Sequence, residues 1–321
     1  MKILVTGGSG FLGQHLLKEL EKGSHEIYAL THINRPIASS RIQMISGDVT
    51  QPESLQTALQ HIEVVYHLAS LMSDDPKMIR ELFKVNVEGT RNLLKQSQQA
   101  GVRRFIYVSS VVTIGSGYTP NEVKDETSQN NTQSLKIENF DSKRLAEELV
   151  LSANHKNFQT LVFNPSLIYG AGDALKPIRA GQVKVARGRQ RFYIEGGVSV
   201  VAVEDVVSVL IAALNKGNPG EKYILSGENL TIRELFSLIA ETAGVPAPSK
   251  KIPTSLLLVL SKIITFLHLP GPLQYKNVKA ATLWHWYNHN KAKEVFDFQP
   301  RPAKEAIANS VNWMKSKHLV K

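Results

Sequence analysis

The glycine-rich turn near the start of the chain constrains its fold most strongly. Gly7, Gly10 and Gly13 follow an apolar run at residues 3–5 and open a helical pattern over residues 11–22. Glycines at this spacing permit a tight strand-to-helix turn and let backbone amides approach a pyrophosphate. The N-terminus of the helix adds free N–H groups and a partial positive charge. We therefore predict a dinucleotide-binding turn, although a purely structural turn has the same spacing.

Short apolar runs alternate with helical patterns through the first half of the chain. The runs are rich in β-branched residues, which is typical of buried strands. They lie at residues 3–5, 27–30, 64–68, 105–108 and 161–164, with a later one at 223–225, and helical spacing occupies 11–22, 52–60, 79–99 and 205–214. This alternation predicts an α/β fold, a Rossmann-type doubly wound parallel sheet with helices on both faces.

The remainder of the chain has a mostly helical pattern. Helical spacing recurs at 231–243, 255–269, 291–296 and 304–314, and prolines separate these segments. We expect a dinucleotide-binding Rossmann domain at 1–165, to which 200–226 returns. A smaller, mostly helical substrate domain would lie within 166–321, formed mainly by 166–199 and 227–321.

The positive charge is unevenly distributed. The chain has 38 Lys and Arg against 28 Asp and Glu, and because residues 1–160 hold 17 of each sign, residues 161–321 carry the whole excess of +10. The densest run consists of Lys176, Arg179, Lys184, Arg187, Arg189 and Arg191. DNA-binding tails are usually low-complexity arms, and none is visible, so we expect no nucleic acid partner. The run is either a solvated face or a rim that attracts an anionic small-molecule substrate.

Composition also excludes several kinds of site and location. Without Cys the chain has no disulfide, thiolate zinc site, iron–sulfur cluster or Cys nucleophile. His285 and His289 could share a helix face but lack a third ligand nearby, so we expect no metal. The longest apolar run, at 256–269, contains Lys262 and falls short of the ~20 residues that cross a bilayer. We expect a cytoplasmic protein without a transmembrane segment, and peripheral membrane contact stays open.

The end of the second strand bears on the choice of cofactor. An acidic residue about 20 residues after the glycines would bind the ribose hydroxyls of NAD, but no Asp or Glu lies between residues 27 and 47. His32 and Arg35 stand there instead, and a basic side chain suits a ribose 2′-phosphate. The pattern favours NADP(H) over NAD(H), with a solvated loop role for Arg35 as the alternative.

The chain as a whole resembles the extended short-chain dehydrogenases/reductases, also called the NAD-dependent epimerase/dehydratase family. The resemblance covers nearly all 321 residues. It rests on the segments 47–50 (GDVT), 67–70 (HLAS), 85–90 (VNVEGT), 105–110 (FIYVSS), 164–170 (NPSLIYG) and 203–206 (VEDV). The C-terminal part is most similar to dihydroflavonol reductase-like and 3-beta-hydroxysteroid dehydrogenase-like members.

The resemblance implies further site residues. Cofactor contacts would be made, besides the glycines, by Phe11, Leu12, Asp48, Val49, Leu68, Ala69, Ser70, Lys143, Pro165 and Ser166. The catalytic group would comprise Ser110, which polarises the substrate oxygen, and Lys143, which fixes the nicotinamide ribose. In the family a tyrosine stands four residues before this lysine, and here the position holds Asn139.

The missing tyrosine leaves the proton source open. An amide can orient a carbonyl or a water, but it cannot act as a general acid. The proton could come from Tyr118, from Tyr169 or from a water held by Asn139 and Lys143. Alternatively the reaction needs no strong acid, or the protein has lost turnover and kept the cofactor.

These features predict an NADP(H)-dependent oxidoreductase of the carbonyl reductase or alcohol dehydrogenase type with an atypical active site. Two other functions remain. One is an NAD-dependent sugar-nucleotide epimerase or dehydratase, and the other is a catalytically impaired NADP(H)-binding module. The resemblance leaves a monomer and a homodimer both open.

Overall fold

The centre of the molecule is a seven-stranded parallel sheet with strand order β10-β6-β5-β4-β1-β2-β3. The computed structural model describes residues 1–31, 39–73, 75–175, 179–267, 269, 271 and 273–320. The strands are β1 (Lys2–Thr6), β2 (Glu26–Thr31), β3 (Ile42–Ser46), β4 (Val64–His67), β5 (Arg104–Val108), β6 (Gln159–Pro165) and β10 (Glu221–Leu225). The order reverses between β1 and β4, where a crevice opens in such sheets.

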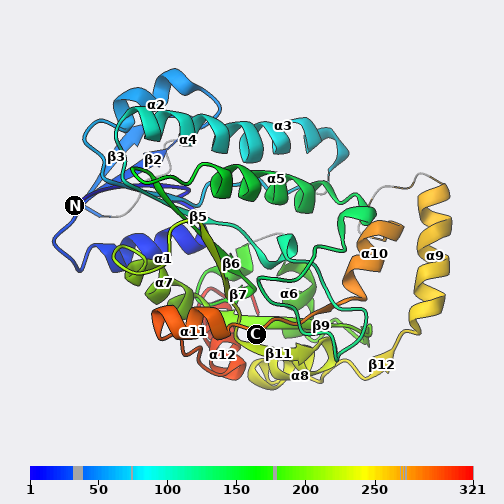
Figure 1. Cartoon of the computed structure of the whole chain (residues 1–321). Helices are drawn as coiled ribbons and strands as arrows, with labels where there is room; N and C mark the ends of the chain where they lie inside the picture. Colours follow the sequence, from blue (N-terminus) through cyan, green and yellow to red (C-terminus); the bar gives the residue numbers. More distant parts are fainter. Residues whose placement is uncertain are drawn as a thin grey trace.

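Helices cover both faces of this sheet (Figure 1). On one face α1 (Phe11–Leu20) packs against α7 (Val203–Ala212), and on the other α2 (Pro52–Ala58) and α5 (Glu138–Ser152) pack against α4 (Gly89–Gln99). Separate apolar clusters fill the two interfaces. The predicted Rossmann-type α/β architecture is therefore confirmed.

Two details of this region differ from the sequence prediction. The edge strand β3 was not predicted, because only its first residue, Ile42, is buried and no continuous apolar run marks it. The predicted helix at 79–99 consists of α3 (Ile79–Phe83), a π-helical turn at Lys84–Glu88 and α4. A single π turn inside a helix is often found at a functional site.

The rest of the chain combines helices with short strands. The helices are α6 (Ala180–Ala186), α8 (Ile232–Ala243), α9 (Thr254–Phe266), α10 (Tyr275–Ala281), α11 (Asn290–Phe296) and α12 (Ala303–Ser316). The strands are β7 (Leu167–Tyr169), β9 (Gly197–Ala202), β11 (Glu228–Thr231) and β13 (Trp284–His285), with a ribbon of β8 (Phe192–Tyr193) and β12 (Lys250–Lys251). Most of these strands have two to four residues, too few to produce a sequence signal.

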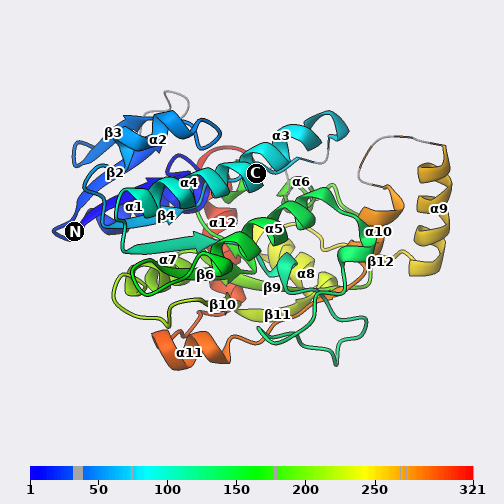
Figure 2. The same cartoon turned by 45° about the horizontal axis from the view of Figure 1, so that its top comes forward.

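Figure 2 shows that α9 and α10 lie at one side of the molecule, away from the N-terminus. The helices α6, α8 and α12 pack together around their own apolar cluster. The helix α9 stands at the outer edge, and its main contact is with α10. The carboxyl ends of the central strands lie at the edge of the sheet that faces this second group of elements.

Candidate active site

The glycine turn is packed tightly against the loop that follows β4. Gly7 has φ +71°, and a Cβ there would lie 2.6 Å from the backbone N of Ala69. A Cβ on Gly13 would lie 2.2 Å from the carbonyl oxygen of Gly7. Helix α1 begins after Gly10 with no side-chain cap and no acidic residue in its first turn. No side chain caps the N-terminus of α1, so an anion placed there would meet the backbone N–H groups of the turn.

A buried histidine joins the ends of β1 and β4. The Nδ1 of His67 lies 2.7 Å from Thr6 Oγ1, and its Nε2 lies 2.9 Å from Thr90 Oγ1. The backbone N–H of Ala69 in turn donates to Thr6 Oγ1. Burial, and after it the nearby charge of Lys143, lower the pKa of His67 to about 3. The ring is therefore neutral at pH 7 and holds the floor of the crevice in place.

Two asparagines fix the loop after β4. Asn86 accepts from the N–H of Leu71 at 2.8 Å and donates to its carbonyl at 2.9 Å, and it also donates to Ser142 Oγ. Asn139 makes the same pair of bonds to Ser73, accepting at 3.2 Å and donating at 2.9 Å. Asn139, which the sequence analysis places at the family's tyrosine position, is thus engaged with the backbone of this loop.

The other two predicted catalytic residues lie at the same ends of the strands. Lys143 is one turn after Asn139 on α5, and its Nζ lies 5.6 Å from the ring centroid of Tyr107 in β5. Ser110 follows β5 and caps a short 3₁₀ helix, accepting at 3.4 Å from the N–H of Val112. That 3₁₀ helix packs against α5. The fold therefore brings the elements carrying all three residues together.

A buried carboxylate beneath Ser110 was not found by sequence reasoning. Glu147 Oε2 accepts from Ser109 Oγ at 2.6 Å, from Thr113 Oγ1 at 2.7 Å and from Asn164 Nδ2 at 2.7 Å. Its Oε1 lies 3.7 Å from Lys222 Nζ. A sequence signal exists, because Glu147 is four residues after Lys143 and so shares its helix face. The cluster ties α5, β5, β6 and β10 together under the site.

The predicted adenine-side residues occupy an ordered turn after β3. The carboxylate of Asp48 accepts from the N–H of Thr50 at 2.8 Å, and the N–H of Asp48 donates to Ser54 Oγ. Val49 is buried and packs against Gly89 in α4. The predicted phosphate-binding residues His32 and Arg35 lie outside the described residues.

The predicted nicotinamide-side residues follow β4 and β6. Leu68, Ala69 and Ser70 lead from β4 into the loop that the asparagines hold. Pro165 ends β6, and Ser166 follows it with a backbone bond to β10. The Oγ of Ser166 is buried and has no hydrogen-bond partner within the described residues. An unsatisfied buried hydroxyl costs free energy, so it marks a position suited to a ligand.

The alternative proton donors lie in different surroundings. Tyr169 is buried in the apolar cluster around α6, α8 and α12, with the guanidinium of Arg179 3.7 Å from its ring centroid, and burial raises the pKa of its hydroxyl. It is therefore enclosed and does not face the crevice. Tyr118 is 58% exposed on the loop after β5. Arg179 itself is buried against Asp173, so this member of the basic run does not form a solvated rim.

The two histidines considered as metal ligands have structural roles. His285 is half-buried, with Nδ1 2.7 Å from Ser116 Oγ and Nε2 2.9 Å from the carbonyl oxygen of Ala280. His289 packs edge-on to Phe298. Within the described ranges no group of three potential ligand side chains is close enough to hold a metal ion.

The fold is that of a Rossmann-type α/β protein, and comparisons with known proteins give the family. Residues 4–232 match the 3-beta hydroxysteroid dehydrogenase/isomerase family. The chain belongs to that family.

Individual relatives match along nearly the whole chain. A putative dihydroflavonol 4-reductase from Synechocystis is 28% identical over 330 residues, which span 99% of this chain and 95% of the relative. The decarboxylating sterol-4-alpha-carboxylate 3-dehydrogenase of Mus musculus is 29% identical, over 93% of this chain and 86% of the relative. The crystal structure of gox2253 has a TM-score of 0.88 and 30% identity, with 99% of each chain covered. The protein is accordingly an oxidoreductase, as the resemblance predicted.

Proposed function

We propose that the protein is an NADP(H)-dependent oxidoreductase that interconverts a carbonyl and an alcohol in the crevice at the carboxyl ends of β1, β4 and β5. The glycine turn carries this proposal. A Cβ at Gly7 or Gly13 would overlap backbone atoms, and the turn opens an uncapped helix. This combination suits a pyrophosphate.

The residues around the turn fit the remainder of a dinucleotide. His32 and Arg35 would receive the 2′-phosphate, which is the reason for preferring NADP(H) to NAD(H). The other contacts would come from Gly7, Gly10, Phe11, Leu12, Gly13, Asp48, Val49, Leu68, Ala69, Ser70, Lys143, Pro165 and Ser166. The buried Ser166 hydroxyl, unsatisfied within the described residues, supports this assignment because a ligand would supply its partner.

The bound cofactor would supply or accept the hydride. Ser110 would donate its hydroxyl proton in a hydrogen bond to the substrate oxygen, since within the described residues its Oγ is only an acceptor, from Val112. The ammonium of Lys143 would hold the nicotinamide ribose and favour negative charge on that oxygen.

Asn139 is a positioning residue in this proposal. Its amide holds the backbone of Ser73, and it has no acidic proton to give. The proton would instead come from the exposed hydroxyl of Tyr118 or from water. Losing a positioned general acid typically lowers the rate ~10²–10⁴-fold, so we expect slow turnover.

The substrate proposal follows the names of two relatives, one a reductase of a dihydroflavonol and one a dehydrogenase of a sterol carboxylate. We propose an apolar ring system that bears the reacting carbonyl or alcohol. A carboxylate on that ring would also suit the excess positive charge of residues 161–321.

A carbonyl panel tests the reaction. NADPH oxidation would be followed with a dihydroflavonol and with 3-oxosteroids that carry or lack a carboxylate. We expect slow oxidation with at least one. Tyr118→Phe should lower kcat by about 100-fold if its hydroxyl is the proton source, and should leave kcat unchanged if water is. Tyr28→Phe, on β2, is the matched control.

A cofactor-binding module without turnover is the second candidate, and the engagement of Asn139 with Ser73 favours it. In that case the wild type would bind NADPH, but no carbonyl compound of the panel would oxidise it. Asn139→Tyr would then create activity. Carbonyl-dependent oxidation of NADPH by the wild type would exclude this candidate.

A further inference from the structure

Helix α9 leaves a continuous apolar stripe uncovered. Leu256, Val259, Leu260, Ile263, Phe266 and Leu267 recur at helical spacing and are all exposed, Phe266 to 80% and Leu256 to 61%. Residues three and four apart share one face of a helix, so these side chains form a single stripe. Exposed apolar patches of this kind usually mark an interaction surface.

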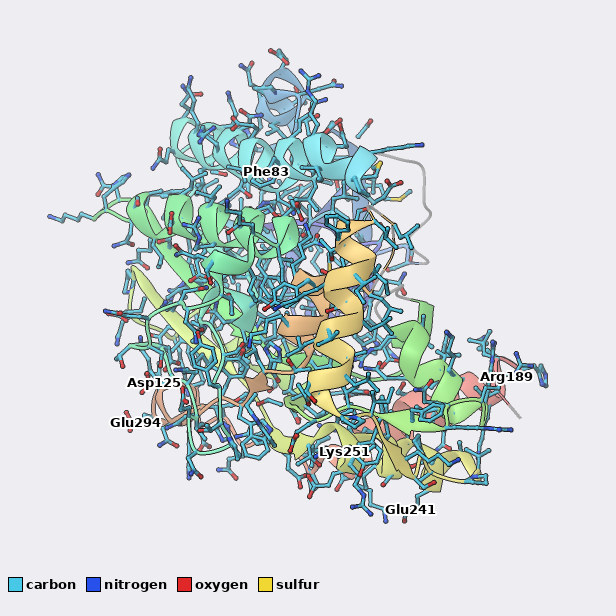
Figure 3. All side chains as sticks on the ribbon, turned by 90° about the vertical axis from the view of Figure 1, so that its right-hand side faces the viewer. Phe83, Asp125, Arg189, Glu241, Lys251 and Glu294 are labelled. Carbon is cyan, nitrogen blue, oxygen red and sulfur yellow. The ribbon has the colours of Figure 1, made fainter. Side chains whose placement is uncertain are left out.

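The stripe faces away from the rest of the molecule. The opposite side of α9, including Leu257, Leu258 and Ile264, is half-buried, and the main contact of the helix is with α10. Figures 1 and 2 show α9 at the outer edge with α10 between it and the body, and Figure 3 shows it in front. Three more exposed apolar side chains add to this surface. Leu269 and Leu273 follow α9 in the chain, and Phe192 lies in the β8–β12 ribbon.

The stretch of chain that carries the stripe has no acidic residue of its own, because residues 242–293 contain no Asp or Glu. The lysines of β12, α9 and α10 are Lys250, Lys251, Lys262, Lys276 and Lys279, of which Lys251 pairs with Glu195 and Lys276 with Glu138. Lys250 and Lys251 form β12, immediately before α9, and Lys251 lies on the same side of the molecule as α9 in Figure 3. An apolar stripe among lysines complements a surface that is both apolar and anionic.

We propose that α9 is a docking element for an anionic lipid surface. Its apolar stripe would enter the boundary between headgroups and acyl chains, and the lysines would contact anionic headgroups. The helix has 13 residues, about 20 Å, whereas a bilayer core is about 30 Å thick. No helix in the described parts of the chain is long and apolar enough to span a membrane. The contact is therefore one in which the helix lies on the surface.

The same charge pattern disfavours a second copy of the chain as the occupant. Pairing two α9 faces would bring two acid-free, lysine-bearing segments together, and like charges at an interface cost free energy.

Docking through α9 would place the membrane beside the candidate active site. Lys276 of α10 pairs at 2.5 Å with Glu138, the first residue of α5, and Asn139 follows it. The chain of contacts from lipid to site is thus α9, α10 and the start of α5. An apolar substrate dissolved in the bilayer would have a short path to the crevice.

Vesicle flotation of the full-length protein tests the proposal. We expect it to float with vesicles of phosphatidylcholine and phosphatidylglycerol in equal amounts, and less with phosphatidylcholine alone. High salt should weaken the binding, because it screens the lysines. Ile263→Asn/Phe266→Asn should lower the partition coefficient at least about tenfold. The matched control, Met44→Asn/Val123→Asn, changes two apolar side chains of comparable exposure outside the patch and should bind as the wild type does.

Two results would overturn the proposal. One is wild-type protein that stays in the soluble fraction with anionic vesicles. The other is a dimer in size-exclusion chromatography that Ile263→Asn/Phe266→Asn converts to a monomer, which would make a second copy the occupant. Thermal unfolding without ligand checks that each variant is folded, and the oxidoreductase proposal does not depend on either outcome.

Discussion

The carboxyl ends of the central strands and the α9 edge differ in whether polar groups are hydrogen-bonded and apolar side chains are covered. At the strand ends, buried polar groups such as His67 and Glu147 have close hydrogen-bond partners, and the apolar side chains are covered. At the α9 edge, apolar side chains are exposed, and the stretch that carries them, residues 242–293, has lysines but no acidic residue. The first region satisfies most of its buried polar groups within the chain, with Ser166 Oγ an exception in the described structure, whereas the apolar side chains of the second are left uncovered.

The same comparison separates the region proposed to bind the cofactor from the region proposed to select the substrate. The first half of the chain is electrically neutral and supplies the glycine turn and the strand ends. The second half carries all the excess positive charge and the exposed helix. Substitutions in the two regions should therefore differ sharply in size and in the property they change.

The largest effect is expected at the glycine turn. Gly7→Ala places a Cβ 2.6 Å from the Ala69 backbone at a φ of +71°, so the turn must deform and nucleotide affinity should fall at least about 100-fold. Nucleotide titration measures the loss. Gly101→Ala is the matched control, because its φ is +77° but no atom lies within 4 Å of the added Cβ. An unchanged affinity in Gly7→Ala would contradict this account of the turn.

A slightly smaller effect is expected at the buried carboxylate. Glu147→Gln removes the charge that faces Lys222, and its NH₂ group must point either at the three donors or at the Lys222 ammonium, so we expect a loss of about 3 kcal/mol in the free energy of unfolding. Denaturant unfolding measures this loss. The neighbouring Glu148 is exposed and pairs only with Arg144 in the described structure, so Glu148→Gln should cost less than about 0.5 kcal/mol. Equal losses in the two variants would show that the cluster is unimportant.

The neutral histidine gives stability a pH dependence. The pKa of His67 is about 3 in the folded protein and near 6.5 when unfolded, so the unfolded chain binds an extra proton between these values. Stability is therefore retained above pH 6.5 and falls as the pH drops toward 3, by about 2 kcal/mol between pH 7 and pH 5. Unfolding curves across this range check the slope. His67→Gln should flatten it by about one proton, and an unchanged slope would contradict the assignment.

The smallest effect is expected at the contact between α10 and α5. Lys276→Gln removes a partly exposed ion pair with Glu138, so the loss in stability should stay below about 1 kcal/mol. Lys276→Gln should have its larger effect on vesicle binding, because the Lys276–Glu138 pair links the α9 edge to the site. A loss of several kcal/mol in unfolding experiments would show that the α9 edge is built into the core.

Local patterns made much of the fold predictable. The glycine turn and the apolar strands are encoded by neighbouring residues, and all six predicted strands of the main sheet are present. The edge strand β3 was not predicted, because most of its side chains face solvent. The short strands around β9 pair with segments distant in the sequence, which no local pattern reveals.

The site was less predictable because its contacts join distant residues. The bonds between Asn139 and Ser73 span 66 residues. The inward position of Arg179 depends on nearby residues, Asp173 and Tyr169, but on packing that no strand or helix spacing indicates. The run at 256–269 reads equally as a buried or a surface helix, and only the structure shows its stripe uncovered. Glu147 had a usable signal in its spacing from Lys143.

Binding of nicotinamide nucleotides tests the central claim most directly. Thermal unfolding would be followed with NADPH, NADP⁺, NADH and NAD⁺ in turn, using the wild type and Gly7→Ala. The account predicts that the two phosphorylated forms stabilise the wild type most, by about 2.7 kcal/mol at a hundredfold excess over Kd, and that Gly7→Ala loses this gain. No stabilisation of the wild type by any of the four nucleotides would contradict it.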